Sequence, residues 1–428
     1  MKLTTILTLI VFLTACSPEP ADLVLHSGKI VTVTDAVPQA EAVAVKGDKI
    51  LLLGSDAEVK SFIGPNTKVI DLQGKLVIPG FIEGHGHYVG LGRSLQRLRL
   101  MNTKNWSEIE QIVAQAVAKA KPGEWIMGRG WHQEKWDQAP ANNVNGWPIH
   151  DAISKMTPDN PVILSHASGH SLFANAKAME LAGITRSTKP LEGGDIIKDK
   201  RGNPIGIFVD NDMRRFGDLY DAYRAQMTDE EKSADSLAVV KLAAEEALKK
   251  GVTSFQDAGE ELEWISTLKK FAEQGELDVR LWVMVLDSLK DLKEKLPSTK
   301  IYRIGNNMMT LGGIKKQMDG ALGSRSAWML EPYSDLPSES GLNLVTMDEM
   351  RELEQLAYDN NLQLCTHAIG DRANREVLNL YEEFFKKHPD KKDWRWRIEH
   401  AQHLHPDDIP RFAELGVITQ GESIVGEG

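Results

Sequence analysis

The octapeptide Gly80-Phe81-Ile82-Glu83-Gly84-His85-Gly86-His87 closes a predicted apolar strand at 76–82 with two histidines two residues apart. Side chains at positions i and i+2 of a strand point to the same side. At the C-terminal mouth of a barrel that side is the interior, so both imidazoles can reach one metal ion. A His-x-His pair alone is a weak indicator, because most such pairs are loop or surface histidines. The remainder of the chain therefore decides how this pair is interpreted.

Beyond Gly74 apolar strands alternate with amphipathic helical segments, a pattern typical of a parallel sheet. Strands are expected at 76–82, 252–256, 279–285, 311–318, 362–366, 396–398 and 417–420. Helices are expected at 229–250, 347–359, 373–387 and 406–415, with Gly251 or Gly416 in C-cap positions. Repeated βα units favour an α/β fold of the (β/α)8 TIM-barrel type over an open sheet, although the pattern alone separates the two poorly.

Two further histidines stand where predicted strands end. His367 follows the strand at 362–366, and His400 follows the strand at 396–398. In a barrel these are the positions of catalytic residues. Imidazole nitrogens suit zinc and related divalent metals, and a bound metal lowers the pKa of water toward neutrality. The four histidines together predict a metal centre.

Lys315 lies within an otherwise apolar predicted strand. A buried lysine is costly unless it is neutral or paired, and a neutral amine can add carbon dioxide to give a carbamate that bridges two cations. One interpretation is therefore a carboxylated Lys315 in a centre of one or two metal ions. The other is that Lys315 or its neighbour Lys316 points outward from the sheet.

The N-terminus predicts a cleaved and lipid-anchored chain. Lys2 precedes an apolar segment at 3–13 that is too short to span a bilayer, and Leu13-Thr14-Ala15-Cys16 follows it. This ending resembles the lipobox of bacterial lipoproteins, which implies a signal peptide at 1–16, lipidation of Cys16 and anchoring in the cell envelope. The serine after Cys16 implies the periplasmic face of the outer membrane. The alternative is an ordinary secretory peptide with an incidental cysteine.

Three further regions follow the predicted signal peptide. A tether and a small unit of antiparallel strands, the N-terminal part of a β-sandwich, occupy 17–79. The barrel occupies 80–428. About 170 residues separate its first two strands, too many for one crossover, which predicts an inserted subdomain at about 100–215.

The chain is similar to the amidohydrolase superfamily of metal-dependent hydrolases, and more narrowly to its amidohydrolase 3, or YtcJ-like, branch. The resemblance rests on the motifs Pro79 to His87, Gly130-Trp131, Ser168-Gly169-His170, Lys315 with Asp319 to Arg325, Thr366 to Asp371 and Arg397 to Gln402. It implies a barrel beside a small β-sandwich and hydrolysis of carbon–nitrogen bonds in small, non-peptide, amide-like substrates. It further implies His85, His87, Lys315, His367 and His400 as metal ligands.

The resemblance also identifies two departures. Glu83 stands where aspartate is commoner, and little effect is expected from this change. The superfamily has an aspartate at the end of an eighth strand that moves protons, whereas residues 421–428 do not resemble such a strand. We therefore expect an incomplete barrel without its eighth strand. A catalytically inactive lipoprotein that only binds metal or ligand is the alternative function.

Other residues are candidates for substrate contact or support. His170, Trp131 and Arg325 are candidates for substrate binding, with a polar insertion residue, subdomain packing and loop structure as the respective alternatives. A structural role is expected for Asp319. Asp371 and Glu399 adjoin ligand histidines and are candidates for orienting them, with helix capping as the alternative for Asp371. Cys365 is expected to be a buried core thiol.

Composition excludes some classes of partner. The 428 residues carry 50 basic and 61 acidic side chains, a net charge of -11, and no long basic segment. A nucleic acid is therefore not an expected partner. With two cysteines, one of them in the signal peptide, the mature chain is expected to contain no disulfide framework.

Overall fold

The computed structural model describes residues 19–322 and 325–421, which form two compact units that meet in sequence at Phe81 and Ile82. The predicted signal peptide with Cys16 lies outside the described residues, and so do residues 422–428. No helix among the described residues is long and apolar enough to cross a membrane.

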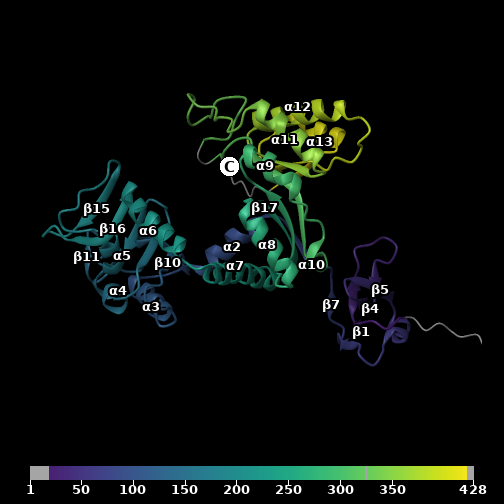
Figure 1. Ribbon diagram of the computed structural model, residues 1–428, viewed down its shortest axis with the longest axis horizontal. Helices are drawn as coiled ribbons and strands as arrows, with labels where there is room; N and C mark the ends of the chain where they lie inside the picture. The colour runs from purple at the N-terminus through teal and green to yellow at the C-terminus, as the bar shows by residue number, and fades with distance from the viewer. Residues whose placement is uncertain (1–18, 323–324, 422–428) are drawn as a thin grey trace, which may run out of the picture. The chain divides into compact units, whose positions relative to one another are not determined.

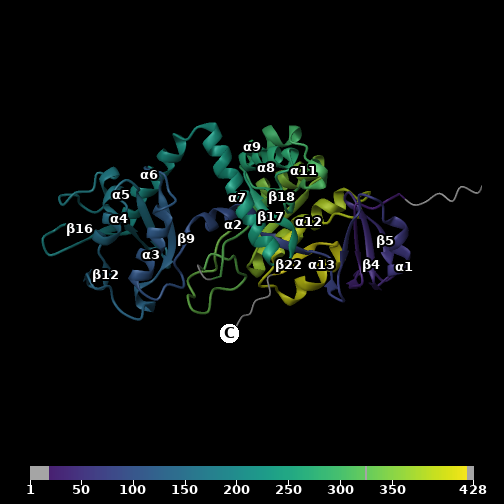
Figure 2. The same ribbon diagram turned by 90° about the horizontal axis from the view of Figure 1, so that it is seen from below.

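Unit 1 consists of two small sheets in the orders β5-β4-β1-β6 and β3-β2-β7 (Figure 2). Its strands are β1 (Leu23–His26), β2 (Lys29–Val31), β3 (Gln39–Ala40), β4 (Ala42–Lys46), β5 (Lys49–Gly54), β6 (Lys68–Asp71) and β7 (Leu76–Val77), and its helices are α1 (Asp56–Val59) and η1 (Lys60–Phe62). The β1–β4, β4–β5 and β2–β3 pairs are antiparallel, whereas β1–β6 and β2–β7 are parallel. Antiparallel pairing therefore describes only part of this unit.

The predicted strand at 76–82 is wrong as a single element. Leu76–Val77 forms β7, which pairs with β2, while Phe81–Gly86 forms β8 in the sheet of unit 2. Pro79 has no N–H to donate to a strand partner and Gly80 is conformationally free, so the ladder breaks between the two segments. The same apolar stretch thus contributes to both units.

Unit 2 contains a seven-stranded sheet in the order β22-β21-β20-β19-β18-β17-β8 (Figure 1). Its strands are β8 (Phe81–Gly86), β17 (Val252–Glu260), β18 (Arg280–Val285), β19 (Met309–Gln317), β20 (Gln363–Ala368), β21 (Arg397–His400) and β22 (Ile418–Gly421). Pairing is parallel from β17 through β22. The amide of Gln420 in β22 lies 2.9 Å from the position that a β-carbon on Gly84 in β8 would occupy. The sheet therefore curls until its two edge strands approach each other, forming a nearly closed barrel.

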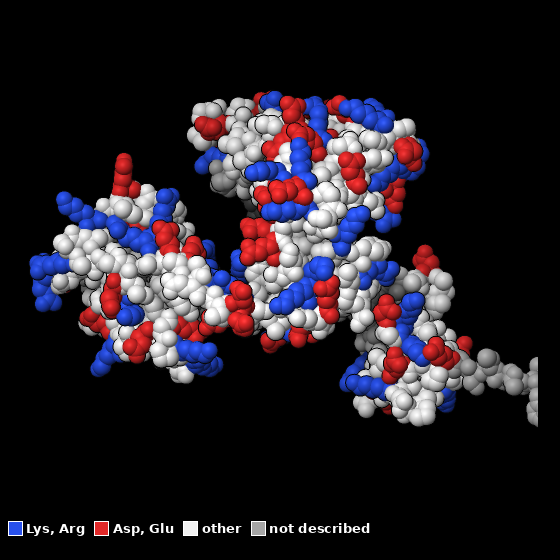
Figure 3. All heavy atoms as spheres, in the orientation of Figure 1, with Lys and Arg blue, Asp and Glu red and all other residues white. Residues whose placement is uncertain are grey.

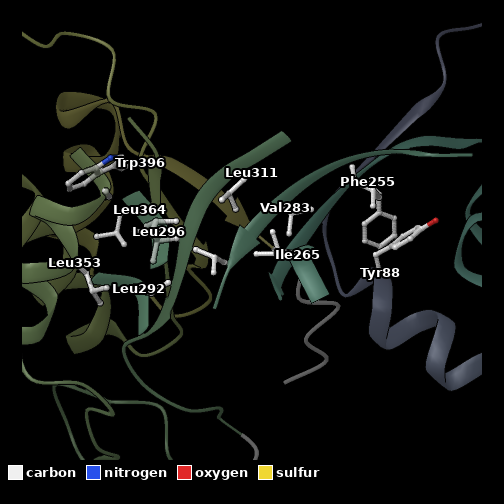
Figure 4. Packing of buried hydrophobic residues seen from close by; sticks show 14 of the residues in the cluster. Tyr88, Phe255, Ile265, Val283, Leu292, Leu296, Leu311, Leu353, Leu364 and Trp396 are labelled. Atoms are coloured by element: carbon white, nitrogen blue, oxygen red, sulfur yellow. The ribbon is translucent and has the colours of Figure 1, made fainter. Parts of the chain in front are cut away.

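Helices cover the outer face of this sheet and bury its main apolar core. They are α2 (Tyr88–Gln96), α7 (Asp229–Lys249), α8 (Leu262–Gln274), α9 (Leu289–Lys295), η4 (Leu296–Ser298), α10 (Ile304–Asn307), α11 (Met347–Asp359), α12 (Asp371–Lys387), η5 (Pro406–Asp408) and α13 (Ile409–Leu415). Figure 4 shows part of the core, with Leu311, Val283 and Leu364 from the strands. Burial of such side chains supplies the largest favourable contribution to folding.

Local sequence signals set the helix ends. Thr228 and Glu231 form a capping box at the start of α7, and Gly416 ends α13 in the left-handed conformation. The prediction of Gly416 as a C-cap is confirmed. Lysine, arginine and acidic side chains are interspersed over the surface that Figure 3 shows, as expected for solvated helix faces.

An insertion separates α2 from α7 and has a core of its own. Its six-stranded sheet has the order β15-β16-β14-β13-β10-β9, and β11 pairs with β12. Its elements are β9 (Leu98–Arg99), α3 (Trp106–Val117), β10 (Ile126–Trp131), η2 (Gln133–Lys135), β11 (Asn143–Val144), β12 (Trp147–Pro148), α4 (Asp151–Met156), β13 (Val162–His166), β14 (Ser171–Ala174), α5 (Ala176–Leu181), β15 (Gly194–Lys198), β16 (Pro204–Asp210), η3 (Asn211–Met213) and α6 (Arg214–Ala225).

Candidate metal centre

His85 and His87 lie at the point where β8 passes into α2. His85 belongs to the strand, and His87 is the N-cap residue of the helix. Their ring centroids are 5.9 Å apart. Both imidazoles are therefore held close together by the first strand-to-helix connection of the barrel.

His367 and His400 join this pair from β20 and β21. The ring of His400 lies 4.7 Å from that of His85 and 4.5 Å from that of His367, measured between centroids. Histidines separated by more than 300 residues thus meet at the carboxyl ends of three strands. In a barrel this is the end that carries catalytic residues.

His400 reaches the cluster through an unusual backbone conformation. Glu399 points into the barrel, so strict alternation would turn the next side chain outward. His400 and Ala401 instead have positive φ angles of 73° and 45°. Non-glycine residues rarely adopt this region, and such residues concentrate at functional sites. The left-handed turn ends the alternation of β21 and allows the His400 ring to face His367 and His85.

Lys315 is buried, with 3% of its surface exposed, and it lies in register with Cys365 of β20. Its strand partner Cys365 precedes His367 by two residues, which places Lys315 on the strand next to the histidine cluster. Lys316 points the other way and pairs with Glu349 of α11 at 2.5 Å. Of the two lysines, Lys316 is therefore the one that points outward.

Glu399 connects β21 with the first strand. Its Oε2 atom lies 2.5 Å from Nδ1 of His85, and its side chain is fully buried. Burial alone would raise the pKa of Glu399, but the hydrogen bond with His85 and the charge of Arg397 keep it below its usual value. An ionised carboxylate at this position accepts a hydrogen bond from Nδ1 of His85 and leaves Nε2 of that ring to face a metal.

The donor set fits a divalent metal of the zinc class. Burial is the largest cause of the lowered pKa values of His87 and His367, and it lowers the pKa of His400 to about 3 together with the nearby His367, His85 and Lys315. These three rings therefore remain neutral, which is the form that binds metal. Within the described residues no group of three or more His, Cys, Asp or Glu side chains is already arranged as a metal site. The centroids of neighbouring rings in the cluster lie 4.5–5.9 Å apart.

Two acidic residues brace the loops around the cluster. Asp319 accepts hydrogen bonds from the backbone N–H groups of Trp328, Ile369 and Gly370 at 2.8–2.9 Å. Its Oδ1 atom also lies 3.6 Å from Nε2 of His367. Asp371 accepts from the N–H of Leu330 at 2.8 Å and begins α12. Both residues therefore hold the segment after β19 against the end of β20.

Glu83 and Cys365 lie close to the ligands without belonging to them. Oε1 of Glu83 accepts a hydrogen bond from the backbone N–H of His85 at 3.1 Å. Cys365 is fully buried beside Ala258 and Met284 inside the barrel, and burial raises the pKa of its thiol. The placement of Cys365 is that of a core thiol.

The three candidates for substrate contact have different surroundings. Trp131 is completely buried in the insertion and donates its indole N–H to the backbone carbonyl of Leu164 at 2.7 Å, a placement that favours the packing alternative. His170 is exposed, with Nδ1 located 2.9 Å from Asp210. Arg325 is also exposed and pairs with Asp335 at 2.7 Å. Substrate contact by His170 or Arg325 remains a prediction.

Arg397 and Gln256 were not singled out from the sequence. Both belong to barrel strands and contact each other inside the barrel. Strand alternation could have indicated Arg397, because residues two apart in a strand point to the same side of the sheet, and Arg397 is two residues before Glu399. Without strand pairing, however, a polar strand residue is more simply interpreted as solvent-facing.

Comparisons with known proteins identify the family of the chain. Residues 68–422 match the model of the amidohydrolase family. The chain is 32% identical over 416 residues to the protein LONG AFTER FAR-RED 3 of Arabidopsis thaliana, a match that covers 93% of this chain and 67% of that protein. It is 25% identical over 415 residues to the N-substituted formamide deformylase of Arthrobacter pascens, covering 92% and 72%.

A solved structure shares the fold as well. The crystal structure of an uncharacterized metal-dependent hydrolase from Pyrococcus furiosus superposes with a TM-score of 0.69 and 25% sequence identity, over 93% of this chain and 76% of that one. The family match extends over most of the chain and contains all five predicted metal ligands. The chain belongs to the amidohydrolase family.

Proposed function

We propose that this protein is a metal-dependent hydrolase that cleaves carbon–nitrogen bonds in small, non-peptide, amide-like substrates at the cluster of His85, His87, His367 and His400. Its family and its likeness to a metal-dependent hydrolase support a hydrolase acting on carbon–nitrogen bonds. The observation that carries the metal-dependent mechanism is the convergence of His85, His367 and His400 from three strand ends.

The residues of the cluster and their neighbours have different roles in binding an ion. A divalent metal, when bound, supplies Lewis acidity and lowers the pKa of a water molecule. The four imidazoles would hold it, and burial keeps His87, His367 and His400 neutral. Glu399 orients His85. Cys365, Lys315 and Glu399 beside the site are almost fully buried, and electrostatic interactions are stronger in such a low-polarity setting.

We propose Lys315 as a further ligand, in carboxylated form. Its neutral Nζ atom attacks the carbon of carbon dioxide, one C–O π pair moves to oxygen, and the nitrogen loses a proton to solvent. The product is a carbamate anion that can bind one or two cations. Burial of Lys315 beside the histidines supports this proposal, because burial favours the neutral amine.

Metal analysis tests the ligand assignment. The purified protein should contain zinc or a similar divalent ion by elemental analysis, and the double variant His85→Ala/His87→Ala should lose it. His26→Ala, in unit 1, serves as a matched control and should retain the metal. Full metal occupancy in the double variant would overturn the ligand assignment.

Hydrolysis tests the catalytic assignment. N-substituted formamides are a suitable first probe class, because the Arthrobacter pascens relative is named for them. If the cluster is catalytic, amine release should stop when a chelator removes the metal and return when zinc is restored. Stoichiometric zinc without hydrolysis across a panel of amide and ester probes would instead favour the metal-binding lipoprotein.

We also propose that lipid at Cys16 anchors the protein to the cell envelope. The support is the lipobox-like sequence Leu13-Thr14-Ala15-Cys16. Cys16→Ser should move the protein out of the membrane fraction, since lipidation is the only anchor proposed. Failure of the wild-type protein to incorporate a fatty-acid analogue would contradict this proposal.

A further inference from the structure

Arg397 places a guanidinium group inside the barrel, where only 4% of the residue is exposed. Arginine stays charged in proteins, and a buried charge is very costly unless it is paired and hydrogen-bonded. The contacts of Arg397 therefore decide how the barrel accommodates this charge.

These contacts reach three other barrel strands. Within β21, Nε of Arg397 lies 2.7 Å from Oε1 of Glu399, an ion pair without hydrogen-bond geometry. Nη2 donates to Oε2 of Glu399 at 3.1 Å. Nη2 also donates to the backbone carbonyl of Gly84 in β8 at 3.0 Å, and Nη1 donates to the side-chain carbonyl of Gln256 in β17. The guanidinium carbon lies 5.6 Å from the ring centre of Trp282 in β18. One side chain thus links β21 to β8, β17 and β18.

Two of these contacts converge on His85. Gly84 is the residue before His85, so the bond to its carbonyl fixes the backbone that carries the imidazole. Glu399, held by the ion pair, lies 2.5 Å from Nδ1 of the same imidazole. Arg397 therefore constrains His85 from the backbone and from the ring.

We propose that Arg397 is a positioning residue of the metal centre, which holds His85 as the Nδ1–H tautomer with Nε2 free for the ion. This inference rests on the proposed function. Lysine at this position keeps the charge but cannot reproduce the planar fork that contacts Glu399 and Gly84 together. Charge alone is thus insufficient for the role.

The test compares Arg397→Lys with Arg395→Lys. Arg395 is an exposed residue two positions earlier that pairs with Asp393, so it is a matched control. In competition with a chromogenic chelator, Arg397→Lys should weaken zinc binding by about 10- to 100-fold, the usual effect of losing a partner that orients a ligand. Arg395→Lys should bind zinc like the wild type.

A second measurement determines the tautomer of His85 in metal-free protein. Nitrogen NMR of metal-free protein labelled in its histidines should show His85 as a single Nδ1–H tautomer in the wild type. In Arg397→Lys it should show a mixture. If wild-type protein binds no zinc, the proposed function fails, whereas the tautomer comparison still decides the role of Arg397.

Folding is controlled separately by thermal unfolding of each metal-free variant. If Arg397→Lys does not fold, Gln256→Ala takes its place, because it removes one guanidinium contact and leaves the Arg397–Glu399 pair. It should produce a smaller change of the same kind. A folded variant with wild-type zinc affinity and an unchanged His85 tautomer would overturn the proposal.

Discussion

The indole of Trp282 in β18 packs directly against the bare α-carbon of Gly312 in β19. A β-carbon added at Gly312 would overlap the indole ring. Gly84 presents a different case, because a β-carbon there would meet the amide at the end of the long Gln420 side chain at 2.9 Å. The interior of the barrel is therefore tightly packed beside Trp282, whereas near Gly84 a side chain can move to make room.

This contrast predicts unequal costs for two identical substitutions. Gly312→Ala should lower the free energy of unfolding by about 3 kcal/mol, because neither the ring nor the strand can move freely. Gly84→Ala should cost less than about 1 kcal/mol, since Gln420 can swing aside. Denaturant unfolding of both variants measures the difference, and equal losses would contradict the packing described for Trp282.

Glu354 predicts a pH dependence of stability. It is buried between α11 and α12, with 2% of its surface exposed and no hydrogen-bond partner for Oε1. Burial and the nearby Glu383 raise its pKa from 4.5 to about 8. Between these values the folded state holds a proton that the unfolded state has lost, so stability falls as the pH rises through this range.

Glu354→Gln should remove this dependence. At pH 5 the variant and the wild type should be about equally stable, because a protonated glutamate resembles glutamine. At pH 9 the variant should be more stable by up to about 4 kcal/mol. Glu352→Gln, on the exposed side of α11, should show no such pH-dependent gain, and a gain that is the same at both pH values would count against a buried proton on Glu354.

The two neighbouring lysines of β19 predict opposite outcomes. If Lys315 is a carbamate bridge, Lys315→Ala should lower the metal content toward one ion per chain, and added short carboxylates should partly restore it. Lys316→Ala should only lose the ion pair with Glu349 and leave the metal content unchanged. Elemental analysis distinguishes these results, and unchanged stoichiometry in Lys315→Ala would remove Lys315 from the ligand set.

The left-handed backbone after β21 predicts that a glycine substitution there stabilises the protein. Ala401 has a φ angle of 45°, and left-handed backbone costs a non-glycine residue about 1–2 kcal/mol. Ala401→Gly removes this cost but increases the entropy of the unfolded chain, so we expect a net gain of 0 to about 1 kcal/mol. Ala222→Gly in the exposed face of α6 should instead lose about 1 kcal/mol. Comparable losses in both variants would show that Ala401 is unstrained.

Much of the barrel could be predicted because its strands and helices have strong local patterns. The helix at 347–359 is confirmed to the residue, and the strand expected at 279–285 begins one residue later, at Arg280, and ends as predicted. The strand at 76–82 was not separable into β7 and β8, because apolarity alone does not reveal which sheet a segment joins.

The candidate site was predictable only as a set of residue types at strand ends. Histidine and lysine positions follow from where apolar segments stop. The left-handed turn at His400 and the contacts of Arg397 depend on neighbours that are distant in sequence. These features arise from tertiary structure, which local propensity and periodicity do not encode.

Cys365 makes the interior of the barrel accessible to experiment. It is the free cysteine of the described residues, and it is fully buried next to Ala258 and Met284. Because burial raises the pKa of its thiol, alkylation requires the strands to part first. In a protein carrying Cys16→Ser, the rate at which Cys365 is alkylated thus measures how often the barrel opens. Added zinc should slow this rate if the ion binds residues from several strand ends.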